Sequence, residues 1–128
     1  MAKKKLLLID DKRKFCQMVK QWLELRENYE VTVAYSGEEG IERAKGTLFD
    51  AVITDFNMPG MSGDAVIETL KLIRPGLPVV LLSVYHDDAA TITPDIRYKA
   101  DAVVGKPINH EQLVKTLENL LVQKRQEL

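Results

Sequence analysis

The chain has 128 residues, of which 45% are hydrophobic and 29% are charged, and its 18 basic and 19 acidic residues nearly cancel. This near neutrality argues against a general nucleic-acid or membrane binder, and the single cysteine, Cys16, excludes an internal disulfide. No apolar stretch is long enough for a signal peptide or a membrane span. We therefore expect a cytoplasmic protein whose residues 1–128 form a single domain, with a core over about residues 4–124.

Five short apolar runs alternate with stretches of helical character. Each run has the length of a strand, and strict alternation with helices predicts a parallel β-sheet covered by helices on both faces. The crossovers between strands should be right-handed. The predicted strands are Leu6–Ile9, Val31–Ala34, Ala51–Thr54, Val79–Leu82 and Ala102–Val104.

The helical stretches show one-sided apolar spacing and recognisable ends. Ser36 suits the N-cap of a second helix over about Gly37–Lys45, and Asn109 suits the N-cap of a last helix over about Glu111–Gln123. A third helix is predicted over about Gly63–Leu72, ahead of a proline. The first helix has an apolar stripe with the spacing of one helix face, formed by Phe15, Met18, Val19, Trp22 and Leu23.

The segment between the fourth and fifth strands is the least regular. Pro94 disfavours a helix that runs through it, because proline lacks the N–H group and clashes with the preceding turn. Thr93 and Pro94 instead suit the start of a short helix over Asp95–Lys99. We therefore predict a long loop after Ser83 and a shortened fourth helix.

Side chains that can carry chemistry lie at the ends of the predicted strands. They are Asp10 and Asp11 after the first strand, Asp55 after the third, Ser83 after the fourth and Lys106 just past the fifth. Because the carboxyl ends of parallel strands face the same edge of a sheet, these side chains should converge on one crevice. Three carboxylates in one crevice repel each other, and a hard dication such as Mg²⁺, Ca²⁺ or Mn²⁺ would relieve that repulsion.

This constellation resembles the receiver domain of two-component response regulators, of the kind found in chemotaxis regulators. The resemblance covers nearly the whole chain. It rests on Asp10-Asp11, on the segment Asp55-Phe56-Asn57-Met58-Pro59-Gly60-Met61-Ser62-Gly63, on Ser83 and on Lys106-Pro107. It implies a flavodoxin-like, doubly wound α/β fold whose five-stranded parallel sheet has the order 2-1-3-4-5.

The resemblance also implies a metal-assisted phosphoacceptor site. Asp55 would accept a phosphoryl group from a phosphohistidine on a sensor histidine kinase or a phosphotransfer protein. Mg²⁺, or Mn²⁺ in its place, would be bound by Asp11, Asp55 and the backbone carbonyl of Asn57, with Asp10 acting through water. Lys106 would pair first with Asp55 and then with a phosphoryl oxygen.

Phosphorylation would then act as a switch. Ser83 would donate a hydrogen bond to a phosphoryl oxygen and draw the loop after the fourth strand inward. That loop and the neighbouring helix would be read by a downstream protein or a fused output domain, without direct nucleic-acid or membrane binding by this domain. Self-catalysed phosphotransfer and autodephosphorylation would be its only chemistry, so we expect a switch and not an enzyme.

Three positions depart from the family pattern. Val103 stands where Tyr or Phe is common, Val84 stands where a small residue is common, and Lys99 stands where Gly often ends a helix with positive φ. We therefore predict that the signal passes through the segment Val84–Pro94 and the short helix instead of an aromatic rotamer. Tyr85 is predicted to shield the acyl phosphate partly from water.

Two other functions were weighed on the same residues. A magnesium-dependent phosphohydrolase of the haloacid-dehalogenase type would carry its aspartyl nucleophile after the first strand, whereas Asp55 follows the third. A flavin or nucleotide carrier would want a hydroxyl- and glycine-rich loop where the chain has Asp10–Lys14. Both are disfavoured. The chain is predicted to be either a stand-alone regulator or, with a slight preference, the receiver part of a longer one.

Several residues have simpler structural explanations. Gly60 and Gly63 are expected to shape the loop after Asp55, since no glycine-rich nucleotide motif is present. Trp22 should face the core, and Cys16 is expected to pack or to lie at the surface and not to act as a nucleophile. His86 and His110 are expected to be isolated and solvated.

Overall fold

The structure, a computed structural model, describes residues 3–26, 28–84 and 99–126. Its strands are β1 (Lys4–Ile9), β2 (Tyr29–Ala34), β3 (Ala51–Asp55), β4 (Val79–Val84) and β5 (Ala102–Lys106). Its helices are α1 (Arg13–Glu24), α2 (Gly37–Gly46), α3 (Gly63–Ile73) and α6 (His110–Gln126). Within these ranges the strands form one parallel sheet in the order β2-β1-β3-β4-β5, which confirms the predicted fold and strand order.

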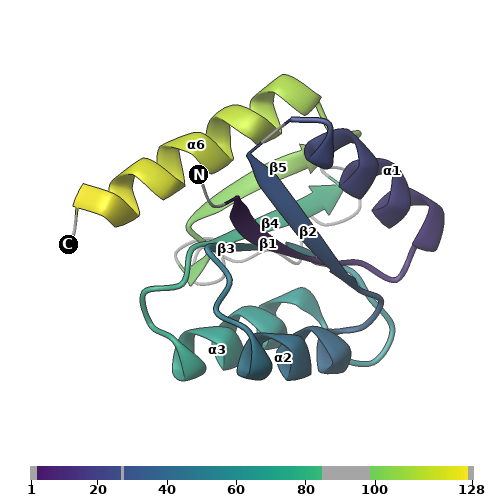
Figure 1. Ribbon diagram of the computed structural model, residues 1–128. Coiled ribbons are helices and arrows are strands. Elements are labelled where there is room, and N and C mark those ends of the chain that lie inside the picture. Colours follow the sequence, from purple (N-terminus) through teal and green to yellow (C-terminus); the bar gives the residue numbers. More distant parts are fainter. Residues whose placement is uncertain (1–2, 27, 85–98, 127–128) are drawn as a thin grey trace.

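The sheet separates two layers of helices. Helices α1 and α6 lie on one face and α2 and α3 on the other (Figure 1). Successive side chains of a strand point to opposite faces, so each central strand contributes to two cores. In β1, Leu7 and Ile9 pack on the side of α2 and α3, whereas Leu6 and Leu8 pack on the side of α1 and α6. Burial on both faces explains why the strand sequences are continuously apolar.

The predicted apolar faces of the helices are largely those that are buried. In α1, however, Cys16 is buried and Met18 is exposed, so the buried stripe is rotated from the predicted one. The two cores take from the helices Cys16, Val19 and Leu23 of α1, Ile41 and Ala44 of α2, Val66, Ile67 and Leu70 of α3, and Leu113, Leu117 and Leu121 of α6.

Both predicted N-caps are present. The Ser36 hydroxyl accepts a hydrogen bond from the Glu39 amide at 3.1 Å, and the Asn109 side-chain oxygen accepts one from the Gln112 amide at 3.1 Å. These bonds satisfy amides that a helix leaves unpaired in its first turn. The N-cap position of α1 is different, because Lys12 occupies it without a side-chain cap bond.

Helices α1 and α6 meet through a pair of aromatic rings that are tilted by 40° to each other. Trp22 is half-buried against the core on this side of the sheet, and the centroid of its ring lies 4.1 Å from that of His110. The Arg26 guanidinium lies 5.1 Å from the Trp22 ring centroid, within reach of a cation–π contact. The expectation that His110 is isolated and solvated was therefore wrong, because it pairs the two helices.

Apart from Val84, which ends β4, the predicted loop after Ser83 lies outside the described residues, and so do Tyr85 and His86. The predicted helix Asp95–Lys99 also lies outside them, except for its last residue. Lys99 itself is described, and no residue other than glycine has positive φ in the described ranges. Its ammonium lies 3.3 Å from a carboxylate oxygen of Glu68 on α3. Lys99 therefore does not adopt the positive φ that glycine often takes at this position, which would be costly for a lysine.

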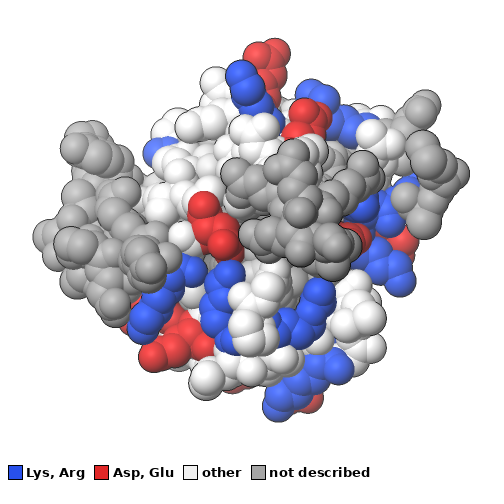
Figure 2. Space-filling model, turned by 90° about the vertical axis from the view of Figure 1, so that its left-hand side faces the viewer, with Lys and Arg blue, Asp and Glu red and all other residues white. Residues whose placement is uncertain are grey.

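The surface carries charges of both signs. Figure 2 shows the side on which the C-terminus lies in Figure 1, and there Lys and Arg are interspersed with Asp and Glu. This mixture agrees with the near-zero net charge of the chain. Within the described ranges, no helix has the length and apolar character that crossing a bilayer requires.

Candidate functional site

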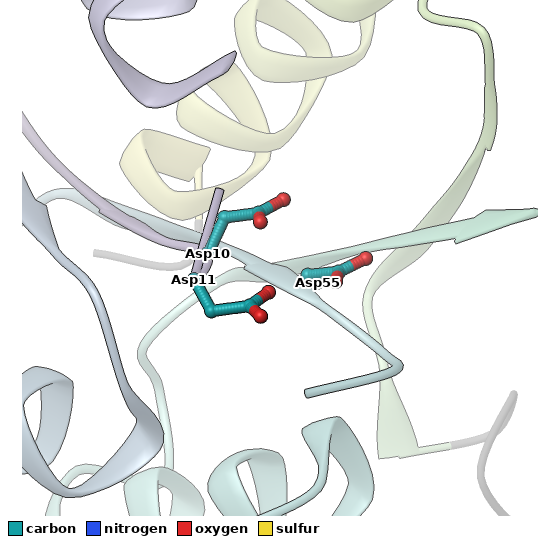
Figure 3. A group of neighbouring side chains, drawn as sticks. All are labelled: Asp10, Asp11 and Asp55. Carbon is teal, nitrogen blue, oxygen red and sulfur yellow. The ribbon is translucent and has the colours of Figure 1, made fainter. Parts of the chain in front are cut away.

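The carboxyl ends of β1 and β3 bring three carboxylates together. Asp10 and Asp11 follow β1 directly, and Asp55 is the last residue of β3, which pairs with β1 through Ile9 and Thr54. One oxygen of each carboxylate lies within 4.8 Å of the other two. Figure 3 shows the three side chains extending the same way from the two strand ends. Asp10 and Asp55 are 0% and 2% exposed, so two of the three charges lie inside the protein.

Lys106 forms ion pairs with two of these carboxylates. It is the last residue of β5, and its ammonium lies 2.7 Å from Oδ1 of Asp55 and 3.2 Å from Oδ2 of Asp10. Its side chain is only 12% exposed and its ammonium lies 4.9 Å from the centroid of the Phe15 ring. The short contact, the burial and the aromatic ring hold this cation in place.

Lys12 is a second cation at the site, and the sequence analysis missed it. Its ammonium lies 3.3 Å from Oδ2 of Asp55, 3.5 Å from Oδ1 of Asp10 and 3.6 Å from Oδ1 of Asp11. Partial burial acts to lower the pKa of Lys12, but the carboxylates of Asp10 and Asp55 outweigh it and the pKa is raised. The available signal was the position of Lys12 directly after Asp10 and Asp11, the two acids predicted to take part in the metal site.

A cavity of about 470 Å³ opens beside the acids. The loop after β3 forms one wall, and its conformation depends on Gly60, whose φ of 78° suits glycine. The exposed Asn57 lies in this wall, next to Asp55. The lining residues are Asp11, Lys12, Asp55, Asn57, Met58, Pro59, Val84 and Lys106.

Ser83 occupies the predicted strand end but is not among the residues that line the cavity. It follows Leu82, the register partner of Asp55 in β4, and it is 6% exposed. Among the described residues it is Val84, and not Ser83, that lines the cavity. Val103 is half-buried and packs against the core on the side of α2 and α3.

The charge of the site favours a further cation. Three carboxylates face two ammonium groups, so a negative charge remains uncompensated. All ligands that the acids can offer are oxygens, which suit hard dications such as Mg²⁺. The donor set therefore fits a magnesium ion held by the acids next to the cavity.

Cys16 supports the site without taking part in its chemistry. It is fully buried under Asp10, and its thiol donates a hydrogen bond to the Asp10 backbone carbonyl at 3.2 Å. Burial, followed by the charge of the Asp10 carboxylate, raises the pKa of the Cys16 thiol to about 12. A thiol of this pKa carries almost no thiolate at neutral pH, which agrees with the predicted packing role.

Solved structures match nearly the whole chain. A response regulator receiver domain protein from Clostridium thermocellum superposes with a TM-score of 0.90 at 29% identity, covering 98% of this chain and 99% of its own. The response regulator TrrA from Thermotoga maritima, solved in complex with Mg(2+)-BeF, superposes with a TM-score of 0.81 at 28% identity, covering 91% of this chain and 98% of its own.

Sequence comparisons give the same relationship. The transcriptional regulatory protein ZraR from Salmonella typhimurium is 27% identical over 121 residues, which are 94% of this chain and 27% of ZraR. This chain thus spans much less than the full length of that relative. The family model of the response regulator receiver domain matches residues 6–118. The chain therefore belongs to the response regulator receiver domain family.

Proposed function

We propose that Asp55 accepts a phosphoryl group from a phosphohistidine of a sensor histidine kinase or a phosphotransfer protein, in a reaction that depends on Mg²⁺. One observation carries this proposal. Asp55 is a buried carboxylate at a strand end that lines an open cavity, next to two further acids and in contact with a fixed ammonium group. A carboxylate in this setting can attack phosphorus and form an acyl phosphate.

The metal would be held by Asp11, Asp55 and the backbone carbonyl of Asn57, with Asp10 acting through water. The clustering of the three carboxylates and the place of Asn57 in the cavity wall support this ligand set. When bound, Mg²⁺ would neutralise phosphoryl oxygens during transfer. Mn²⁺ shares the preference for carboxylate and carbonyl oxygens and could replace it. The Mg(2+)-BeF complex of the related TrrA supports the same assignment.

Lys106 and Ser83 would respond to the new charge. Lys106 already contacts Asp55 and needs little movement to pair with a phosphoryl oxygen. Ser83 is buried and does not line the cavity, so we propose that its hydroxyl reaches a phosphoryl oxygen through a shift of the end of β4. This shift would couple phosphorylation to the segment Val84–Pro94, of which only Val84 is described. We propose this segment and the following helix as the surface that partners read.

The protein would thus be a phosphoacceptor switch and not an enzyme with a separate substrate. We propose that the whole chain, residues 1–128, is one receiver domain with a core over 4–124. It would act on a downstream protein or a fused output domain, without itself binding nucleic acid or membrane. The cytoplasmic location and the self-catalysed loss of phosphate stay predictions.

Intact-mass spectrometry after incubation with a small phosphodonor tests the proposal. Wild-type protein should gain about 80 Da in the presence of Mg²⁺ and much less in EDTA, because one PO₃ group is added. Asp55→Asn should show no gain, since the amide cannot form the acyl phosphate. Asp64→Asn, the same change at an acid in the first turn of α3 that is not part of the carboxylate group, should behave as wild type. A wild type that never gains this mass, or an Asp55→Asn variant that does, would contradict the proposal.

A further inference from the structure

Lys12 contacts the same three carboxylates, of Asp10, Asp11 and Asp55, that could hold a metal ion. Among the described residues it is the only cation with ion pairs to Asp10, Asp11 and Asp55 together. Lys106 contacts two of the three and takes Oδ1 of Asp55, whereas Lys12 takes Oδ2. Both oxygens of Asp55 are therefore engaged by ammonium groups.

The two lysines are held differently. The contacts of Lys12 span 3.3 to 3.6 Å and its side chain is 57% exposed, whereas Lys106 approaches Asp55 to 2.7 Å and is 12% exposed. The backbone of Lys12 is nevertheless anchored, because its amide donates a hydrogen bond to Oδ1 of Asp10 at 3.0 Å. The backbone thus stays at the site while the long side chain is free to turn out into water.

We propose that Lys12 is an internal counterion that occupies the acidic site until a divalent cation displaces it, so that Lys12 sets the Mg²⁺ concentration at which the site is loaded. The identity of the cation rests on the proposed function. A metal held by Asp55 needs Oδ2, because Lys106 retains Oδ1, and Oδ2 is the oxygen that Lys12 contacts. An ammonium group and a dication cannot occupy the same position beside these oxygens. The metal must therefore break the ion pairs of Lys12 before it binds, and the free energy that this costs lowers the affinity for the metal.

Calorimetric titration with MgCl₂ at constant ionic strength tests the inference. Lys12→Met keeps the length of the side chain and removes its charge, and it should bind Mg²⁺ about three- to tenfold more tightly than wild type. Lys12→Arg keeps a cation and should stay close to wild type. Lys14→Met removes the same charge from an exposed residue in the first turn of α1 and should change the affinity by less than about twofold.

Melting in EDTA and in saturating Mg²⁺ separates this role from ordinary structural support. Lys12→Met should melt below Lys14→Met in EDTA, because the acids lose a counterion, and the two should melt alike in Mg²⁺. An equal difference between the variants in both conditions would overturn the inference.

The outcomes also separate the inference from the proposed function. If Lys12→Met binds Mg²⁺ no more tightly than Lys14→Met while Asp55 is still phosphorylated, only the role of Lys12 is overturned. If Lys12→Met binds Mg²⁺ more tightly but Asp55 is never phosphorylated, the role of Lys12 stands and the proposed function fails. Absence of Mg²⁺ binding in every variant would overturn both.

Discussion

At the scale of single residues, Gly63 fixes how closely the loop after β3 approaches the acids. A Cβ atom at this position would lie 2.6 Å from the Asp55 carbonyl oxygen and 2.6 Å from the Cα atom of Phe56. Both are backbone atoms, which cannot give way as a flexible side chain can. The Gly63 amide also donates a hydrogen bond to the Phe56 carbonyl at 2.8 Å. The position therefore requires glycine because of space and not because of φ.

We expect Gly63→Ala to lower the free energy of unfolding by about 1–3 kcal/mol, because the added methyl group forces the backbone around Asp55 to shift. Urea denaturation followed by circular dichroism measures the change. Gly46→Ala is a matched control, since a Cβ atom there meets nothing within 4 Å. It should be neutral or slightly stabilising because alanine favours the helix. Equal effects of the two substitutions would contradict this explanation.

The site residues differ in how well the sequence predicts them. Asp10, Asp11, Asp55 and Lys106 lie where apolar strand-like runs stop, and parallel strands end at one edge, so their proximity follows from the pattern. Lys12 could not be placed in this way, because a flexible side chain next to two acids can turn toward them or into water. Whether Ser83 or Val84 lines the cavity depends on how far β4 continues, and strand ends are poorly defined by sequence.

At the scale of elements, the C-terminal half of α1 protects the edge of the sheet. Strand β2 lies at one end of the strand order, so outward-facing backbone groups of β2 have no neighbouring strand to pair with. Glu24 accepts a hydrogen bond from the Val31 amide at 3.0 Å, and Lys20 donates one to the Val31 carbonyl at 2.6 Å. Lys20 and Glu24 also pair with each other at 2.9 Å. One helical turn thus satisfies both polar groups of an edge residue.

We expect Glu24→Ala to cost about 1 kcal/mol at neutral pH, because the Val31 amide loses its partner. The amide hydrogen bond, followed by the ammonium of Lys20, lowers the pKa of Glu24 from its usual 4.5. A carboxyl group with a lowered pKa stabilises the fold above its unfolded pKa, and this stabilisation fades as the pH falls through the folded pKa. The difference between wild type and Glu24→Ala should therefore shrink below about pH 4.

Urea denaturation at a series of pH values measures this dependence. Glu42→Ala is a suitable control, because Glu42 forms only a surface pair with Lys45 at 3.4 Å. Its effect should be small at every pH, as is usual for exposed ion pairs. A Glu24→Ala effect that stays constant down to low pH would contradict the role of the charged carboxylate.

The periodicity of apolar residues predicted which segments form helices and strands better than it predicted which face of each helix is buried. The buried faces of α3 and α6 agree with their apolar spacing, and so does the alternation of strands and helices within the described residues. In α1, apolar residues extend around more than one face, so spacing alone could not decide between Met18 and Cys16. The structure decides for Cys16 because its thiol fits under the backbone of Asp10. The family match likewise decides against the phosphohydrolase and flavin-carrier alternatives.

At the scale of the whole molecule, the acidic site lies at the carboxyl ends of β1 and β3, two strands that contribute side chains to both hydrophobic cores. The unfolded chain cannot gather Asp10, Asp11 and Asp55, because the first two are far from the third in sequence. A cation that needs all three therefore binds only the folded state and stabilises it. The same folding event that builds both cores assembles the ligands.

We expect Mg²⁺ to raise the melting temperature of the wild type, with a stabilisation of about 2.7 kcal/mol at a concentration one hundred times Kd. Asp11→Asn should lose most of this increment, because a charged oxygen ligand is removed. Differential scanning calorimetry with MgCl₂, and with NaCl at matched ionic strength as the control, measures it. The same increment in NaCl, or an unchanged increment in Asp11→Asn, would contradict specific binding at the acids.

The tilted pair of rings between α1 and α6 gives the protein an intrinsic fluorescent probe. Trp22 is the only tryptophan of the chain, and it lies against His110 where the first and last helices meet. Tryptophan fluorescence therefore reports on the contact between α1 and α6. A movement of α6 relative to α1 would change the intensity or the wavelength of this fluorescence. Movements of the C-terminal helix can be followed in solution without attaching a dye.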